Sequence, residues 1–144
     1  RLDSLQAAIL EVKLKYLPDY ILARQKAANI YDALLKEIPE VELPYRSSSS
    51  RHVFHQYTLK IHQNLRDKLV DFLKTAGIPT GIYYPLPVFD QEAYSNNSLN
   101  KNKFPVSQKL CKQVISLPMH TELTLEMQEY IAKHIITFFK NRHE

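Results

Sequence analysis

The first third of the chain carries two apolar stripes with the three- and four-residue spacing of an amphipathic α-helix. Their members are Leu2, Leu5, Ile9, Val12 and Tyr16, followed by Tyr20, Ala23, Ala27, Ile30 and Leu34. Pro18 lies between the stripes, and we expect a kink or break there because proline removes a backbone donor and crowds the preceding turn. Pro39 ends the pattern. A bent helix of about 35 residues is long for a small domain and more typical of a bridge between domains.

These patterns divide the chain into an inter-domain helical segment, residues 1–38, and a small C-terminal domain, residues 39–144. The helical pattern begins directly after Arg1, without an initiator methionine or a polar leader. We therefore expect the chain to be the C-terminal part of a larger protein.

Over residues 53–62 the sequence pattern repeats every two residues, which predicts a β-strand. Asn64 stands where a helix cap is expected, Asp67 follows three residues later, and Gly77 marks the end of that helix. Residues 78–84 predict a second strand. A strand, a helix and a strand in this order imply a right-handed crossover onto a small sheet.

The sequence from residue 83 onward predicts one irregular stretch, two helices and a short strand. Residues 83–104 show no regular period, and irregular stretches above about 15 residues are often functional. Pro105 begins a helix, residues 115–117 form a strand, and Thr124 caps a terminal helix. The expected buried face of that helix consists of Met127, Ile131, Ile135 and Phe138. The predicted fold class is α/β with an α+β small domain: a long bent N-terminal helix, then a small sheet with helices packed on it.

Composition argues against several classes of protein. No apolar run approaches the roughly 18 residues of a membrane-spanning helix, so no membrane partner is expected. The net charge of +4 comes from scattered basic residues, which favours a solvated surface over a nucleic-acid interface. The single cysteine, Cys111, excludes an internal disulfide and fits a cytoplasmic protein. Gly77 and Gly81 are the only glycines, too few for a glycine-rich phosphate loop.

No self-sufficient catalytic set is visible in the sequence. His52 and His55 are three residues apart on an expected strand, so they face opposite sides and are not expected to share a metal. Residues 47–50 are serines without a glycine elbow or a paired base, which favours a flexible loop. None of the lysines lies in the apolar setting that activates a lysine for Schiff-base chemistry.

Four ordered blocks of the sequence resemble one protein family. The blocks are Arg1–Leu10, His55–Thr58, Tyr83–Pro87 with Gln91 and Tyr94, and Ser116–His120. In this order and spacing they resemble the C-terminal portion of the DegT/StrS-like nucleotide-sugar aminotransferases, pyridoxal-phosphate enzymes of the aspartate-aminotransferase fold (fold type I). The resemblance extends from Arg1 to about Lys140.

The resemblance implies a homodimer in which a long helix joins a large cofactor domain to a small C-terminal domain. A lysine of the large domain would anchor pyridoxal phosphate, and an amino donor, usually glutamate, would supply the amine for a keto nucleotide-sugar. In the family, the blocks that carry this lysine lie upstream of the portion seen here. We therefore expect this chain alone to hold no cofactor and to be inactive.

The resemblance also implies four substrate-binding residues. Arg1 matches an arginine that reaches toward the neighbouring subunit's active site, where a guanidinium can grip a carboxylate or phosphate. Tyr83 and Tyr84 match a His/Tyr-Tyr-Pro segment that lines the substrate side of the pocket, and Gln91 follows in the same block. Many relatives carry histidine in place of Tyr83 and of Phe89, so the sugar is not identified. A packing role for both tyrosines also stays open.

Two other functions remain open on the sequence. Strand–helix–strand units also build ferredoxin-like domains, so the chain fits a free-standing ligand-binding or regulatory α+β module. Such a module needs neither the long leading helix nor the four ordered blocks. A nucleic-acid-binding domain would account for the positive charge and the aromatic residues, but the sequence lacks aromatic-rich strand motifs and a basic stripe.

Overall fold

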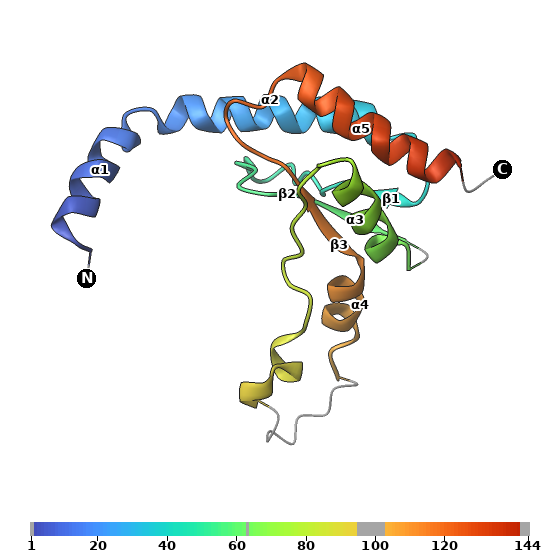
Figure 1. Cartoon of the computed structure of the whole chain (residues 1–144). Coiled ribbons are helices and arrows are strands. Elements are labelled where there is room, and N and C mark those ends of the chain that lie inside the picture. Colours follow the sequence, from blue (N-terminus) through green and yellow to red (C-terminus); the bar gives the residue numbers. More distant parts are fainter. Residues whose placement is uncertain (1, 63, 95–102, 142–144) are drawn as a thin grey trace.

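The computed structural model describes residues 2–62, 64–94 and 103–141, and Figure 1 shows their arrangement. In chain order the elements are α1 (Ser4–Leu14), α2 (Leu17–Leu35), β1 (Val41–Glu42), β2 (Tyr57–Ile61), α3 (Arg66–Thr75), the 3-10 helices η1 (Val88–Asp90) and η2 (Glu92–Tyr94), α4 (Pro105–Gln113), β3 (Val114–Leu117) and α5 (Leu125–Lys140). Strands and helices form a central body. Helix α1 extends away from this body in one direction, and the 3-10 helices η1 and η2 extend away in another (Figure 1).

The expected break near Pro18 is confirmed, because α1 stops before it and α2 starts as a new helix. Asp3 is the N-cap of α1, and its Oδ1 accepts a hydrogen bond from the Leu5 N–H at 2.8 Å. Pro18 occupies the first turn of α2, where its missing N–H needs no partner. Helix α1 buries no residue. The buried residues of α2 lie in its second half: Ala27, Ala28, Tyr31 and Leu35. The interpretation of residues 1–38 as an inter-domain segment stays a prediction.

The sheet contains β1, β2 and β3 in that order, and both strand pairs are antiparallel. The predicted strand over residues 78–84, on which the expected crossover depended, is wrong. These residues contribute one isolated bridge, between Gly81 and Ser116 of β3. Pro79 contributes to this outcome, since a proline cannot donate a ladder hydrogen bond. The bridge joins β3, while β2 lies between β1 and β3.

The two ends of α3 give opposite outcomes. Asn64 has a φ of +56°, in the left-handed region that asparagine tolerates, and the N-cap position falls on Leu65 without a side-chain bond. Asn64 therefore turns the chain and does not cap the helix as predicted. The predicted stop at Gly77 is confirmed: its φ is +71°, and the Ile78 N–H donates back to the Leu73 carbonyl at 2.9 Å.

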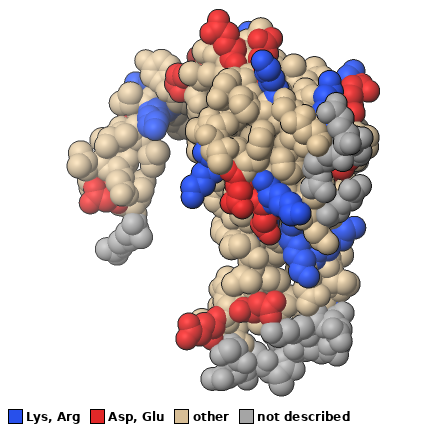
Figure 2. All heavy atoms as spheres, turned by 45° about the vertical axis from the view of Figure 1, so that its right-hand side comes forward, with Lys and Arg blue, Asp and Glu red and all other residues tan. Residues whose placement is uncertain are grey.

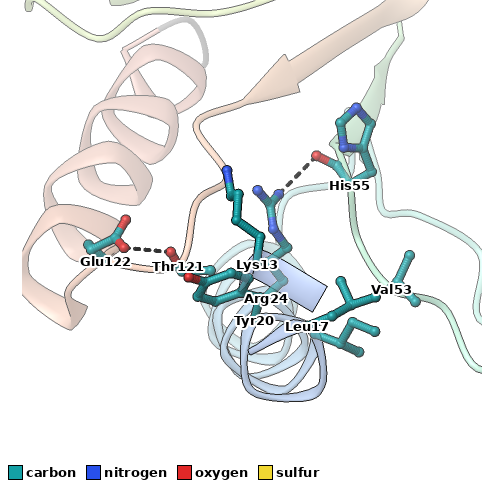
Figure 3. A pocket seen from close by; sticks show the side chains of 9 residues that line it. Lys13, Leu17, Tyr20, Arg24, Val53, His55, Thr121 and Glu122 are labelled. Atoms are coloured by element: carbon teal, nitrogen blue, oxygen red, sulfur yellow. Dashed lines mark hydrogen bonds between the residues drawn. The ribbon is translucent and has the colours of Figure 1, made fainter. Parts of the chain in front are cut away.

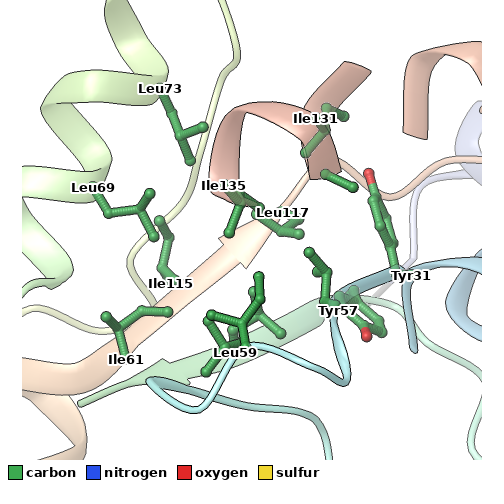
Figure 4. Packing of buried hydrophobic residues seen from close by; sticks show 14 of the residues in the cluster. Tyr31, Tyr57, Leu59, Ile61, Leu69, Leu73, Ile115, Leu117, Ile131 and Ile135 are labelled. Atoms are coloured by element: carbon green, nitrogen blue, oxygen red, sulfur yellow. The ribbon is translucent and has the colours of Figure 1, made fainter. Parts of the chain in front are cut away.

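One hydrophobic core joins the sheet to α2, α3 and α5, as expected for an α+β small domain. The side chains of Tyr57, Leu59 and Ile61 all point into this core, because every second residue of a strand faces the same side of the sheet. Figure 4 shows side chains from the three helices and from β3 that meet there: Tyr31, Leu69, Leu73, Ile115, Leu117, Ile131 and Ile135.

The terminal helix α5 begins as predicted. Thr124 is its N-cap, and the hydroxyl accepts a hydrogen bond from the Met127 N–H at 3.2 Å. The two central isoleucines of the expected face are buried. The rest of the face is rotated from the prediction, because Phe139 is buried in place of Phe138 and Met127 is 50% exposed.

Candidate substrate pocket

Arg24 of α2 holds together two loops that are distant in sequence. Its Nη1 donates to the carbonyls of Phe54 at 3.3 Å, His55 at 3.1 Å and Met119 at 3.1 Å. The first two carbonyls precede β2, and the third follows β3. One side chain therefore fixes the entry to β2 and the exit from β3 against α2. Nothing in the sequence analysis singled out Arg24, because its partners are main-chain carbonyls that no residue type marks.

A pocket of about 380 Å³ lies beside this contact, and we call it the loop pocket. Its lining includes Arg24, His55, Gln56, Gly81, Tyr83, Ser116 and Met119. Apart from Arg24 of α2, these residues come from three stretches that lie far apart along the chain: the loop before β2, the segment after α3, and β3 with its following loop. Three of the four blocks in the sequence that carry the family resemblance therefore meet at this pocket.

Gly81 leaves the space in which the ring of Tyr83 lies. A Cβ at position 81 would stand 2.5 Å from a ring carbon of Tyr83 and 2.8 Å from its hydroxyl oxygen, closer than real contacts allow. Gly81 is itself tied to the sheet, since its N–H donates to the Ser116 carbonyl at 3.0 Å and its carbonyl accepts from the Ser116 N–H at 2.7 Å. The Tyr83 ring thus has a defined position relative to β3. The rarity of glycine in this sequence was the one available signal for Gly81.

The four predicted substrate-binding residues are not all brought together. Tyr83 lines the loop pocket and is 49% exposed. Tyr84 packs edge-on against Tyr83, with ring centroids 6.0 Å apart, but is 70% exposed and lies outside the pocket lining. Gln91 follows η1, is exposed, and does not line the pocket. Arg1 lies outside the described residues. The substrate-binding role of all four stays a prediction.

A second pocket, of about 440 Å³, is also lined by Arg24, and we call it the helix pocket (Figure 3). Its lining consists of Lys13, Leu17, Tyr20, Ile21, Arg24, Val53, His55, Thr121 and Glu122. Glu122 accepts a hydrogen bond from the Thr121 hydroxyl at 2.6 Å, and His120 lies 3.7 Å away. The Thr121 bond, with help from His120, lowers the pKa of Glu122 below its ordinary value. Glu122 is therefore ionised at neutral pH.

The surroundings of the described lysines bear on where pyridoxal phosphate could be anchored. Every described lysine is exposed except Lys60, which is half-buried and paired with Glu42 at 2.5 Å. A Schiff-base lysine needs a desolvated setting that none of these has. Among the same residues, no group of three His, Cys, Asp or Glu side chains is placed to hold a metal. The expectation that this chain alone holds no cofactor stays a prediction.

The surface charges and the helices bear on the expected absence of nucleic-acid and membrane partners. On the face in Figure 2, basic and acidic side chains are interspersed, without one large basic patch. Within the described part of the chain, no helix has the length and apolar content needed to cross a membrane. The absence of nucleic-acid and membrane partners stays a prediction.

Known proteins similar to this chain agree on a family. The DegT/DnrJ/EryC1/StrS aminotransferase family matches residues 1–136. A pleiotropic regulatory protein of Geobacillus stearothermophilus is 39% identical, over 98% of this chain and 38% of that protein. The UDP-2-acetamido-2-deoxy-3-oxo-D-glucuronate aminotransferase of Pseudomonas aeruginosa is 41% identical, over 85% of this chain and 33% of that protein. The crystal structure of ntda from Bacillus subtilis with bound cofactor PMP has a TM-score of 0.79 at 28% identity, over 97% of this chain and 33% of that one.

The extent of these similarities decides what they show. The chain spans 33% to 38% of the length of these three relatives. A match over a third of a protein does not show that this chain has the activity of the whole protein. The family match nevertheless covers all but the last residues, and the structural match covers nearly every element described above. The expected aminotransferase-type fold is thus confirmed. The chain belongs to the DegT/DnrJ/EryC1/StrS aminotransferase family.

Proposed function

We propose that this chain forms the C-terminal part of a pyridoxal-phosphate-dependent enzyme that transfers an amino group, supplied by glutamate, to a keto nucleotide-sugar. The observation that carries the proposal is the loop pocket, where three family blocks from distant parts of the sequence meet around Arg24. Similarity to a named UDP-sugar aminotransferase and to a PMP-bound structure supports the substrate class and the cofactor. We further propose a cytoplasmic homodimer in which residues 1–38 lead from a large cofactor domain.

In this proposal the chain shapes the substrate side of the active site. Tyr83 offers a ring face to the sugar and a hydroxyl as a hydrogen-bond donor, and Gly81 leaves the space that this ring occupies. Tyr84 and Gln91 lie outside the lining of the loop pocket and would contact the substrate beyond it, and Arg1 would reach toward the partner subunit's active site to pair with an anionic group. The cofactor, when bound, supplies the electron sink. Its Schiff-base lysine belongs to the part of the enzyme outside this chain, so the chain alone should be inactive.

Reduction with borohydride tests where the lysine lies. The longer enzyme, mixed with pyridoxal phosphate and reduced, should retain about one covalent pyridoxyl group per subunit, because a Schiff base becomes a stable amine on reduction. The 144-residue chain, treated in the same way, should retain no specific adduct. A stoichiometric adduct on one lysine of the shorter chain, located by peptide mass spectrometry, would contradict the proposal.

The substitution Tyr83→Ala in the longer enzyme tests the pocket itself. Loss of a ring that contacts the sugar should raise the KM for the sugar about tenfold, while the absorbance of the bound cofactor stays unchanged. Tyr45→Ala is the matched control, because Tyr45 is 84% exposed and lies away from the pocket lining. Equal loss of sugar turnover and cofactor binding would instead assign Tyr83 a structural role.

A regulatory module is the second candidate, and one observation favours it: the relative at 39% identity is named a pleiotropic regulatory protein. The borohydride experiment separates the two functions. A regulatory protein without aminotransferase chemistry should retain no pyridoxyl group in either the longer or the shorter form. An adduct in the longer form alone supports the enzyme.

A further inference from the structure

We propose that the helix pocket is a binding site for a phosphate or diphosphate group, with the side chains of Lys13 and Arg24 as its cationic ligands. Neither residue belongs to the blocks that carry the family resemblance. The inference rests on this chain's own geometry and holds whether or not the proposed aminotransferase activity is correct.

Arg24 is already oriented for an anion. Its Nη1 is engaged by three carbonyls, which hold the guanidinium plane in place before any ligand arrives. Among the described residues, Nε and Nη2 have no hydrogen-bond partner, and the side chain is half-buried at the pocket wall. A guanidinium fixed on one side offers two remaining donors in a plane, the arrangement that matches two oxygens of a phosphate.

Lys13 adds a second positive charge from a different helix. It lies in the last turn of α1 and has no ion pair within the described part of the chain. Figure 3 shows its side chain beside that of Arg24, with both cationic ends pointing the same way. Two neighbouring like charges repel each other in the empty pocket, and an anion that contacts both relieves this repulsion.

The remaining walls suit a ligand larger than a single phosphate. Leu17, Ile21 and Val53 supply apolar surface, and a volume of about 440 Å³ lies within the range of small-molecule sites. Glu122 is the one acidic wall, and Figure 3 places it apart from the Lys13 and Arg24 ends. Because its lowered pKa keeps it ionised, it should repel an anion and limit the affinity.

Calorimetric titration of the 144-residue chain tests the site directly, with pyrophosphate, inorganic phosphate, uridine diphosphate and uridine as four separate probes. Pyrophosphate should bind more tightly than inorganic phosphate, uridine should not bind, and affinity should fall as salt rises. Tighter binding of uridine diphosphate than of pyrophosphate would identify a nucleotide as the source of the diphosphate. Equal binding would identify a free diphosphate.

Three exposed positions keep the test independent of folding, which circular dichroism checks for each variant. Lys13→Gln should weaken pyrophosphate binding about fivefold, and Glu122→Gln should strengthen it about threefold, since the first removes an attractive charge and the second a repulsive one. Lys15→Gln is the matched control: it removes the same charge two residues away, from outside the pocket lining, and should change binding less than twofold. Absence of pyrophosphate binding by the wild-type chain would overturn the proposal. So would equal weakening by Lys13→Gln and Lys15→Gln, or no effect of Glu122→Gln.

Discussion

Helices α1 and α5 are both apolar on one side and both begin with a side-chain cap, yet they end in opposite environments. Helix α5 packs against α2 and α3 and buries five residues, whereas α1 buries none. Leu5 of α1 is 72% exposed and Ile9 is 53% exposed, while Ile135 of α5 is fully buried. The comparison teaches that an apolar stripe predicts a helix but not whether the same chain supplies the surface that covers it.

The largest expected effect comes from truncating the same residue type in the two helices. Ile135→Ala should lower the free energy of unfolding by about 2–5 kcal/mol, because it leaves a cavity in the core. Ile9→Ala should change the free energy of unfolding by less than about 0.5 kcal/mol, because the side chain is half exposed and its truncation leaves no cavity in the core. Urea unfolding of both variants, followed by circular dichroism, gives the two values. A large loss from Ile9→Ala would show that α1 is covered within this chain.

Removal of the Tyr57 hydroxyl should have an intermediate effect on stability. This hydroxyl donates to Asp32 Oδ1 at 2.7 Å. Burial, and then the bond to Asp32, raise the pKa of Tyr57 well above its ordinary value of 10.0. The folded state therefore holds this proton more tightly than the unfolded state does. Stability from this group is complete below about pH 10 and is lost as pH rises further, because the unfolded chain then ionises first.

Tyr57→Phe should act differently at neutral and at alkaline pH. At pH 7 it should cost about 1 kcal/mol for the lost hydrogen bond. Above about pH 10 it should make the decline in stability shallower by about 1.4 kcal/mol per pH unit, since one titrating group is gone. Burial also raises the pKa of Tyr31, so part of the decline should remain. Urea midpoints from pH 7 to pH 11 measure both effects, with Tyr45→Phe as the exposed control. Parallel curves for Tyr57→Phe and the wild type would contradict the assignment.

Local signals in the sequence predicted most of the helices. Pro18, Gly77 and Thr124 act on their immediate neighbours, through a missing donor, a tolerated positive φ and a cap, so each effect was readable without tertiary structure. The strand pairing was not readable in this way. Residues 78–84 and 114–117 both have strand-like composition, but the second segment pairs with β2 over four residues and the first makes one bridge to the second.

The sequence predicted a residue of the candidate site only where the residue type itself carried a signal. Tyr83 was found through the resemblance and does line the loop pocket. Arg24 was missed because its partner Met119 lies 95 positions away and is contacted through a carbonyl. The same holds for Gly81, whose role depends on where the ring of Tyr83 folds back.

The smallest expected effects come from the two caps. Thr124→Ala should lower the free energy of unfolding by about 1 kcal/mol, because it removes the acceptor for the Met127 N–H in a helix that packs on the core. Asp3→Ala removes a comparable bond to the Leu5 N–H. Since α1 contributes no residue to the core, its first turn can fray without the body unfolding, and the global midpoint should stay within error. Amide hydrogen exchange at Leu5 should nevertheless quicken several-fold. If Asp3→Ala instead shifts the global midpoint as far as Thr124→Ala does, α1 unfolds together with the body. The two helices would then differ in the exposure of their side chains and not in their contribution to global stability.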